Sequence, residues 1–188
     1  MKQLILASAS PRRKALMAHF EYPFESITPI KDEVLDDTLS IPKQIQKLSY
    51  DKAFEIFEKY PDAIVIGADT AISFEHEVLG KPHTKENAIK MLKRLQGNTH
   101  TVITAVSIIS KEKEHSFISQ TSVTFYEMND EEIENYVNTK EPLDKAGAYT
   151  IQEKGARFIK EIQGDYYTVM GLPVSKLYQV LKEDFHLY

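Results

Sequence analysis

The sequence of 188 residues contains no cysteine, and this absence excludes several kinds of chemistry. Without cysteine the chain has no disulfide, no thiolate nucleophile and no cysteine-based zinc site. The sequence also lacks any apolar run near the roughly 20 residues that a helix needs to cross a bilayer. Its first residues do not have the layout of a secretory signal peptide. We therefore expect a cytoplasmic protein that does not associate with membranes.

The chain also lacks an excess of positive charge, since its net charge is −5. Broad nucleic-acid surfaces need a basic face, so stable nucleic-acid binding is not expected. A small anionic ligand is still compatible with this charge, because a pocket needs only local cations. No glycine-rich loop closes with Gly-Lys-Ser or Gly-Lys-Thr, and no kinase or dinucleotide fingerprint occurs. The six histidines are scattered without metal-ligand spacing.

The apolar residues that are present predict an α/β protein. Continuous apolar runs at 4–7 and 63–68 predict buried strands, and residues 40–60 predict a long helix. Alternation at 101–109 and 117–125 predicts an antiparallel hairpin, so the sheet is expected to be mixed rather than purely parallel. Other expected elements are strands at 24–27 and 157–162, and helices beginning near Thr84, before Ile133 and at Gly171.

The first candidate for chemistry is the stretch that joins the first strand to the first helix. Ser10 is predicted to cap that helix and Pro11 to be its first residue. Hydroxyls of Ser8 and Ser10, together with the guanidiniums of Arg12 and Arg13, suit phosphate oxygens at a helix start. A well-capped helix with solvated arginines explains the stretch equally well, so both interpretations stand at this point.

The second candidate is the carboxylate of Asp69, which the predicted strand at 63–68 delivers, together with Thr70, into an apolar stretch that continues through Ala71 and Ile72. A carboxylate in such apolar surroundings needs a partner or a metal ion, and a hydrogen-bonded structural aspartate is the alternative. Lys52 lies on the apolar stripe of the 40–60 helix, so it either reaches the surface or points into a polar site. His100 begins a strand and is expected to be structural or hydrogen-bonded.

Six short motifs occur in a fixed order along almost the whole chain, from Leu4 to about Leu181. They are Ser8-Ala9-Ser10-Pro11-Arg12-Arg13, Gly67-Ala68-Asp69-Thr70, Gly80-Lys81-Pro82, His100-Thr101-Val102-Ile103-Thr104, Glu141-Pro142-Leu143-Asp144-Lys145-Ala146-Gly147-Ala148-Tyr149 and Gly171-Leu172-Pro173. Each motif is weak alone, but together they resemble the Maf family of nucleoside triphosphate pyrophosphatases.

The resemblance implies a fold similar to that of inosine-triphosphate pyrophosphatases. That fold has an elongated mixed central sheet with flanking helices, and two lobes around a cleft. Residues 1–188 would form one Maf-like domain whose lobes share the sheet. The implied reaction converts a nucleoside triphosphate and water to the monophosphate and pyrophosphate, with a divalent cation, Mg²⁺ or Mn²⁺. A homodimer is also implied.

The resemblance assigns roles residue by residue. Asp69 would accept the proton, and Glu33 and Asp69 would hold the metal, with Glu141 and Asp144 as further candidates. The triphosphate would be lined by Ser8, Arg13, Lys52 and Lys81, and Lys145 would be a further cation for phosphate or for ordering its loop. Arg12, Thr70 and Gln152 fall where the branch that hydrolyses dTTP and UTP resembles this chain. A glutamine amide offers the donor and acceptor that suit a pyrimidine.

Three other functions remain open on the sequence. A sister branch of the family prefers 7-methyl-GTP. A nucleotide-binding regulator of cell division or septum formation would bind nucleotide without significant turnover. A nucleic-acid module using Arg12, Arg13 and Lys14 is disfavoured by the acidic total. Hydrolysis of dTTP and UTP, with related or modified pyrimidine nucleotides, is the function that the sequence favours.

Overall fold

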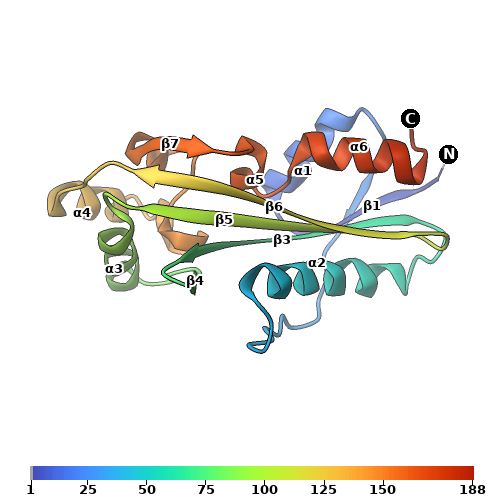
Figure 1. Cartoon of the computed structure of the whole chain (residues 1–188), viewed down its shortest axis with the longest axis horizontal. Coiled ribbons are helices and arrows are strands. Elements are labelled where there is room, and N and C mark those ends of the chain that lie inside the picture. The colour runs from blue at the N-terminus through green and yellow to red at the C-terminus, as the bar shows by residue number, and fades with distance from the viewer. Residues whose placement is uncertain (1) are drawn as a thin grey trace. The chain divides into compact units, whose positions relative to one another are not determined.

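A computed structural model describes residues 2–188 and shows the mixed α/β architecture that the sequence predicts. Within these residues the strands form one sheet in the order β2-β1-β3-β5-β6-β7, and β4 pairs with β3 (Figure 1). β1 is parallel to β2 and β3, whereas β4 and β7 are antiparallel to their partners. The strands are β1 (Leu4–Ala7), β2 (Glu25–Ile27), β3 (Ile64–Phe74), β4 (Glu77–Leu79), β5 (Thr99–Ile109), β6 (Glu114–Phe125) and β7 (Ile159–Gln163).

The predicted helix starts are confirmed at two caps. Ser10 Oγ accepts a hydrogen bond from the N–H of Arg13 at 3.4 Å, and Thr84 Oγ1 accepts one from Asn87 at 3.2 Å. The α-helices are α1 (Pro11–Met17), α2 (Ile41–Phe57), α3 (Lys85–Leu95), α4 (Asp130–Asn138), α5 (Tyr166–Met170) and α6 (Val174–Phe185). Short 3₁₀ turns cover η1 (Ala18–Phe20), η2 (Glu141–Asp144), η3 (Ala146–Ala148) and η4 (Lys154–Phe158).

Several elements differ from the prediction. β3 continues to Phe74, beyond the predicted end at residue 68, and Asp69 and Thr70 lie inside the strand. The predicted strand at 157–162 begins only at Ile159, because η4 occupies its first residues. β4 and α5 were not predicted. Such short elements depend on contacts with distant segments rather than on their own periodicity.

The chain divides into two compact units, which are described separately. Unit 1 comprises the residues up to Thr70, Thr104–Ser119 and Met170–Tyr188. In unit 1, α2 lies on one face of the sheet and α6 on the other (Figure 1). A buried apolar cluster between α2 and the strands consists of Ile5, Ala7, Ala53, Ile56, Ala63, Val65 and Ile109. This packing fixes α2 against β1 and β3.

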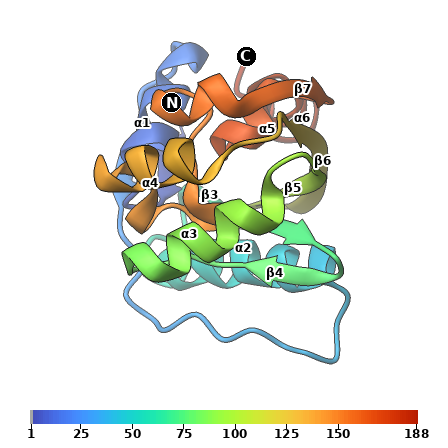
Figure 2. The same ribbon diagram turned by 90° about the vertical axis from the view of Figure 1, so that its left-hand side faces the viewer.

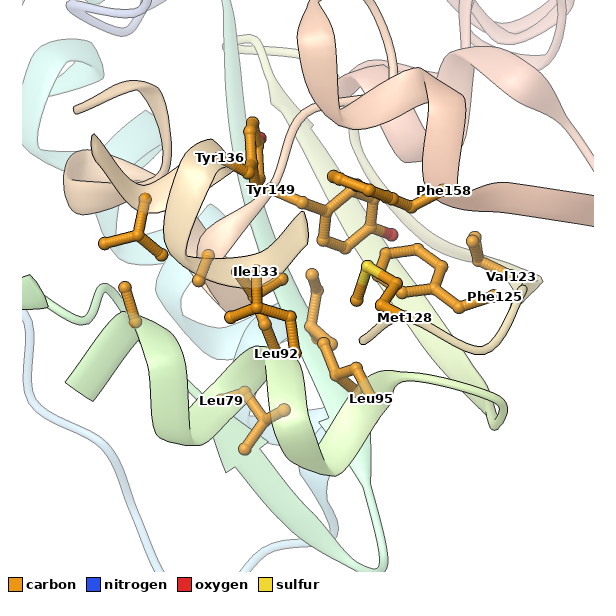
Figure 3. Packing of buried hydrophobic residues seen from close by; sticks show 14 of the residues in the cluster. Leu79, Leu92, Leu95, Val123, Phe125, Met128, Ile133, Tyr136, Tyr149 and Phe158 are labelled. Atoms are coloured by element: carbon orange, nitrogen blue, oxygen red, sulfur yellow. The ribbon is translucent and has the colours of Figure 1, made fainter. Parts of the chain in front are cut away.

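Unit 2 comprises Ala71–Ile103 and Gln120–Val169. Its helices α3 and α4 lie side by side (Figure 2). Its core joins leucines of α3 to aromatic rings from β6, α4 and the segments after α4 (Figure 3). The Tyr149 ring lies 4.8 Å from the Phe125 ring, centroid to centroid. His100 is buried in this core, in agreement with the structural role expected from the sequence.

Among residues 2–188, none of the helices combines the length and the apolar character that a bilayer crossing requires.

Candidate active site

Asp69 lies in β3 beside the place where α2 packs directly on that strand. Gly67 makes this packing feasible, since an ideal Cβ there would lie 2.2 Å from the carbonyl oxygen of Ser49 and 2.7 Å from the backbone nitrogen of Ala53. A side chain at position 67 would therefore push the helix away. Lys52 lies between Ser49 and Ala53 in the sequence of α2. The close packing of α2 on β3 therefore brings the Lys52 side chain to Asp69.

Lys52 links two carboxylates in unit 1. Its Nζ donates to Asp69 and also lies 2.8 Å from Glu33 Oε1. The side chains of Lys52 and Asp69 are only 16% and 12% exposed, whereas that of Glu33 is 58% exposed. Lys52 therefore points into a polar site rather than to the surface, and Asp69 has the partner that its burial requires.

Arg13 is held as a fork at the start of α1. Its Nε donates to the carbonyl oxygen of Gly171 at 2.8 Å, and its Nη2 donates to Thr70 Oγ1 at 2.9 Å. Thr70 Oγ1 lies in turn 2.9 Å from Thr104 Oγ1. Burial lowers the pKa of Arg13 from its ordinary value, and the nearby charge of Asp69 acts in the opposite direction. The guanidinium remains charged, because arginine does not lose its proton in proteins.

The other predicted residues of unit 1 flank this group. Ser8 is buried just after β1, and its Oγ accepts a hydrogen bond from the N–H of Ser10 at 3.2 Å. Arg12 is half-buried, and its side chain makes no hydrogen bond or ion pair within residues 2–188. Unit 1 thus places a carboxylate, an ammonium and a guanidinium near one another, with hydroxyls at the same end of β1 and β3.

Unit 2 holds the remaining predicted residues on two adjoining segments. The N–H of Gly147 donates to the carbonyl oxygen of Gly80 at 3.1 Å, which joins the segment of Lys81 to that of Lys145. Lys145 Nζ lies 2.7 and 2.8 Å from the two carboxylate oxygens of Asp144. The hydrogen bond from Lys145 lowers the pKa of Asp144, and the charge of Lys81 acts in the same direction. Lys81 and Lys145 therefore form one local group of cations.

Gln152 is exposed, and its side chain makes no hydrogen bond in the part of the chain that the structure describes. Its position is defined instead by its neighbours in sequence. Thr150 Oγ1 donates to Glu141 Oε1 at 3.1 Å, and the N–H of Lys154 donates to Glu141 Oε2 at 3.2 Å. The segment is therefore attached on both sides of Gln152.

Glu141 serves as the anchor for that segment. Besides Thr150 and Lys154, its carboxylate accepts hydrogen bonds from the hydroxyl of Tyr136 at 2.8 Å and the N–H of Gly155 at 3.1 Å. Burial acts to raise the pKa of Glu141, but these donors bring it below the ordinary value. With four donors on its oxygens, Glu141 holds this part of the chain together.

Sequence reasoning missed Glu55, which is a buried carboxylate on α2. It accepts hydrogen bonds from the N–H groups of Ile30 at 3.0 Å and Lys31 at 3.1 Å. Burial acts to raise its pKa, but these hydrogen bonds and the contact with Lys59 bring the pKa below the ordinary value. The available signal was its spacing, because Glu55 lies three residues after Lys52 on the same helical stripe.

No group of three or more histidine, aspartate or glutamate side chains is arranged to hold a metal ion within residues 2–188. Glu33 and Asp69, the two predicted metal-binding carboxylates, both contact the Lys52 ammonium.

The model of the Maf-like protein family matches residues 3–184, so the chain belongs to the Maf family. The resemblance predicted from the six motifs is therefore confirmed. A protein of Bacillus velezensis named dTTP/UTP pyrophosphatase is 48% identical over 182 residues, covering 97% of this chain and 96% of the relative. A dTTP/UTP pyrophosphatase of Bacillus cereus strain G9842 is 48% identical over 183 residues, with the same coverage of both chains.

Among solved structures, the Ham1 protein of Staphylococcus aureus is similar in fold, with a TM-score of 0.50. The match covers 96% of this chain and 98% of that protein, at 16% sequence identity. This likeness agrees with the predicted fold class.

Proposed function

We propose that this chain hydrolyses dTTP and UTP to the nucleoside monophosphate and pyrophosphate. The observation that carries the proposal is the buried Asp69 carboxylate, which lies against the Lys52 ammonium within the electrostatic reach of Arg13. Such an arrangement suits a triphosphate, because phosphoryl and nucleotidyl transfer depends on charge neutralisation and positioning. The relatives that are 48% identical over nearly the whole chain support the choice of substrate.

In the proposed reaction Asp69 acts as the general base. It accepts a proton from a water molecule whose oxygen attacks the α-phosphorus of the nucleotide. The bond from the α-phosphorus to the oxygen that bridges to the β-phosphate breaks, and pyrophosphate leaves with that oxygen. Lys52 orients the Asp69 carboxylate, while Arg13 and the Ser8 hydroxyl donate to phosphate oxygens.

A divalent cation, Mg²⁺ or Mn²⁺, is part of the proposal. Mg²⁺ is usually held by one or two carboxylates together with substrate phosphates and water, rather than by an all-protein cage. Glu33 and Asp69 would supply such a pair of carboxylates, because both contact the Lys52 ammonium and are therefore close to each other. When bound, the cation would neutralise phosphate charge.

The residues of unit 2 enter the proposal through the family resemblance. Lys81 and Lys145 are assigned to phosphate binding, which their proximity to each other supports. Gln152, Arg12 and Thr70 are assigned to recognition of the nucleobase. The exposed amide of Gln152 and the guanidinium of Arg12, which makes no hydrogen bond or ion pair within residues 2–188, support this assignment, because both groups have donors to offer a ligand.

Two further parts of the proposal are a homodimer, which the family resemblance implies, and a cytoplasmic location, which the features of the sequence lead us to expect. Light scattering on the purified chain measures its mass in solution and tests the dimer. A monomer at micromolar concentration would contradict it.

Pyrophosphate release from a panel of nucleoside triphosphates, with Mg²⁺ or Mn²⁺ added, tests the main proposal. We expect dTTP and UTP to be the best substrates. Asp69→Asn should lower kcat by about 10²- to 10⁴-fold, the usual contribution of a general base. Asp62→Asn is the matched control, since Asp62 is exposed just before β3.

Each other result of the panel has a definite meaning. Near-normal turnover by Asp69→Asn would overturn the assigned base. A clear preference for 7-methyl-GTP would place the chain with the sister branch. Saturable nucleotide binding without pyrophosphate release would identify a regulator instead of an enzyme.

A further inference from the structure

The Glu33 carboxylate lies on a loop with little regular structure of its own. Residues 28–40 connect β2 to α2 without helix or strand. Large apolar side chains of this loop are exposed, including Val34 at 69% and Leu35 at 47%. A loop that buries so little apolar surface gains little from the hydrophobic effect, so other contacts must hold it in place.

Two buried or half-buried side chains of α2 hold the beginning of this loop. Glu55, which is only 2% exposed, accepts the N–H of Ile30 with both carboxylate oxygens, at 3.0 and 3.2 Å, and the N–H of Lys31 at 3.1 Å. Lys52 holds the Glu33 side chain at 2.8 Å. The backbone of the loop and its functional carboxylate are thus attached to consecutive turns of one helix.

The hydrogen bonds that Glu55 accepts from the loop are stronger than those between two neutral groups. Hydrogen bonds from backbone N–H groups to an ionised carboxylate are charge-assisted, and a buried site excludes competing water. If the carboxylate is lost, the two N–H groups lose their acceptor. Glu33 would then depend on a single, half-exposed ion pair, and such pairs contribute little by themselves.

We propose that Glu55 is a positioning residue for the reaction: it holds Ile30 and Lys31 so that Glu33 stays at Lys52, beside Asp69. The inference rests on the proposed function for its catalytic consequence. Its structural part, the attachment of the loop, stands on the contacts of Glu55 alone.

The first test measures the loop directly, without substrate or metal. Glu55→Gln keeps the size of the side chain but replaces one acceptor oxygen by a donor, which faces the loop N–H groups. We expect amide hydrogen exchange at Ile30 and Lys31 to accelerate about tenfold or more, the order of effect expected for losing a hydrogen bond to a charged group. Unchanged exchange at both amides would overturn the proposal.

Glu58→Gln is the matched control. Glu58 is the C-cap residue that directly follows α2, and it contacts the same loop only through an exposed ion pair with the Lys31 side chain at 3.2 Å. Removing that pair should leave both exchange and activity essentially unchanged. If Glu58→Gln has the same effect as Glu55→Gln, any contact to the loop suffices and Glu55 has no special role.

The second test asks whether Glu55 acts through Glu33. In the wild-type background, Glu55→Gln should lower kcat for dTTP by about tenfold and raise the Mg²⁺ concentration for half-maximal rate, as is typical when a supporting partner of a ligand is lost. In a Glu33→Gln background, the same substitution should have almost no further effect. Equal losses in both backgrounds would show that Glu55 acts through general stability, and would contradict the positioning role.

The outcomes separate the two proposals. If wild-type protein releases no pyrophosphate from dTTP or UTP, the proposed function fails, while amide exchange still decides whether Glu55 holds the loop. If Glu55→Gln does not fold, Glu55→Asp takes its place in both tests. The aspartate keeps the charge but is one methylene too short to reach both N–H groups, so the same results are expected from it.

Discussion

The Nε2 atom of His100 lies 2.7 Å from the hydroxyl oxygen of Tyr149, inside the core of unit 2. The imidazole also packs edge-on against the ring of Phe125, with centroids 5.1 Å apart. Within residues 2–188 its Nδ1 atom has no hydrogen-bond partner. Burial in this apolar core disfavours a positive imidazolium and lowers the pKa of His100 to about 4.

This histidine predicts a pH-dependent stability. Between its folded pKa of about 4 and its ordinary value of 6.5, the unfolded chain binds a proton that the folded chain does not. The free energy of unfolding should therefore be highest above pH 6.5 and fall by about 3 kcal/mol towards pH 4. Urea unfolding at several pH values from 4.5 to 7.5 measures the slope.

His100→Gln should flatten that slope, because it removes the titrating group. His83→Asn, which changes an exposed histidine of the same unit, should keep it. The lowered pKa values of carboxylates such as Glu55 and Glu141 change the free energy of unfolding mainly below their ordinary pKa of 4.5, which is below the pH range measured. A slope that persists in His100→Gln would contradict the assignment.

Glu141→Gln should destabilise the protein through the segment around Gln152. The amide can accept with one atom only, so at least one of the four donors loses its acceptor. We expect the free energy of unfolding to fall by about 1–3 kcal/mol, the cost of unsatisfied buried donors. Glu134→Gln on the exposed side of α4 is the control, and thermal unfolding compares the two. Equal midpoints would show that the four hydrogen bonds are energetically unimportant.

Arg13→Lys should impair catalysis although it keeps the charge. A lysine cannot donate to the carbonyl oxygen of Gly171 and to Thr70 Oγ1 in the geometry of the guanidinium fork. We expect kcat/KM for dTTP to fall about ten- to a hundredfold, as for loss of a charge-assisted hydrogen bond. Lys14→Gln, an exposed change on α1, should have no such effect, and an unimpaired Arg13→Lys enzyme would mean that charge alone suffices.

Gly67→Ala should separate α2 from β3. The added methyl group would meet backbone atoms of Ser49 and Ala53, which cannot rotate away as a flexible side chain would. Overpacking of this kind costs about 1–3 kcal/mol, and pyrophosphate release should fall with it because Lys52 is displaced from Asp69. Gly80→Ala is the control for stability, because an added Cβ there meets nothing within 4 Å. Similar thermal midpoints for the two variants would refute the packing argument.

The longer elements were predictable because their burial follows a period. α2 and the hairpin strands repeat apolar residues at helical or alternating spacing, and Ser10 and Thr84 mark helix starts through local hydrogen bonds. The start of β4 and all of α5 had no such local signal. β4 is three residues long and exists through its pairing with β3.

The candidate site was predictable in composition but not in geometry. Lys52 and Asp69 were recognisable as charges in apolar surroundings, and Arg13 as a cation at a helix start, whereas the role of Glu33 came from the resemblance. The anchoring roles of Glu55 and Glu141 were not visible, because each depends in part on backbone N–H groups, which lie up to 25 residues away in sequence. Hydrogen bonds of this kind depend on loop paths, which residue type and spacing do not encode.

The placement of Asp69 inside β3 also bears on how the chain can change in evolution or in the laboratory. β3 lies between β1 and β5 in the sheet, so an inserted or deleted residue there would shift the register and turn its side chains to the opposite face. The loop between Glu33 and Leu39 has no such constraint. Length variation should therefore accumulate in that loop, and libraries that seek altered metal or substrate use can vary it while keeping β3 intact.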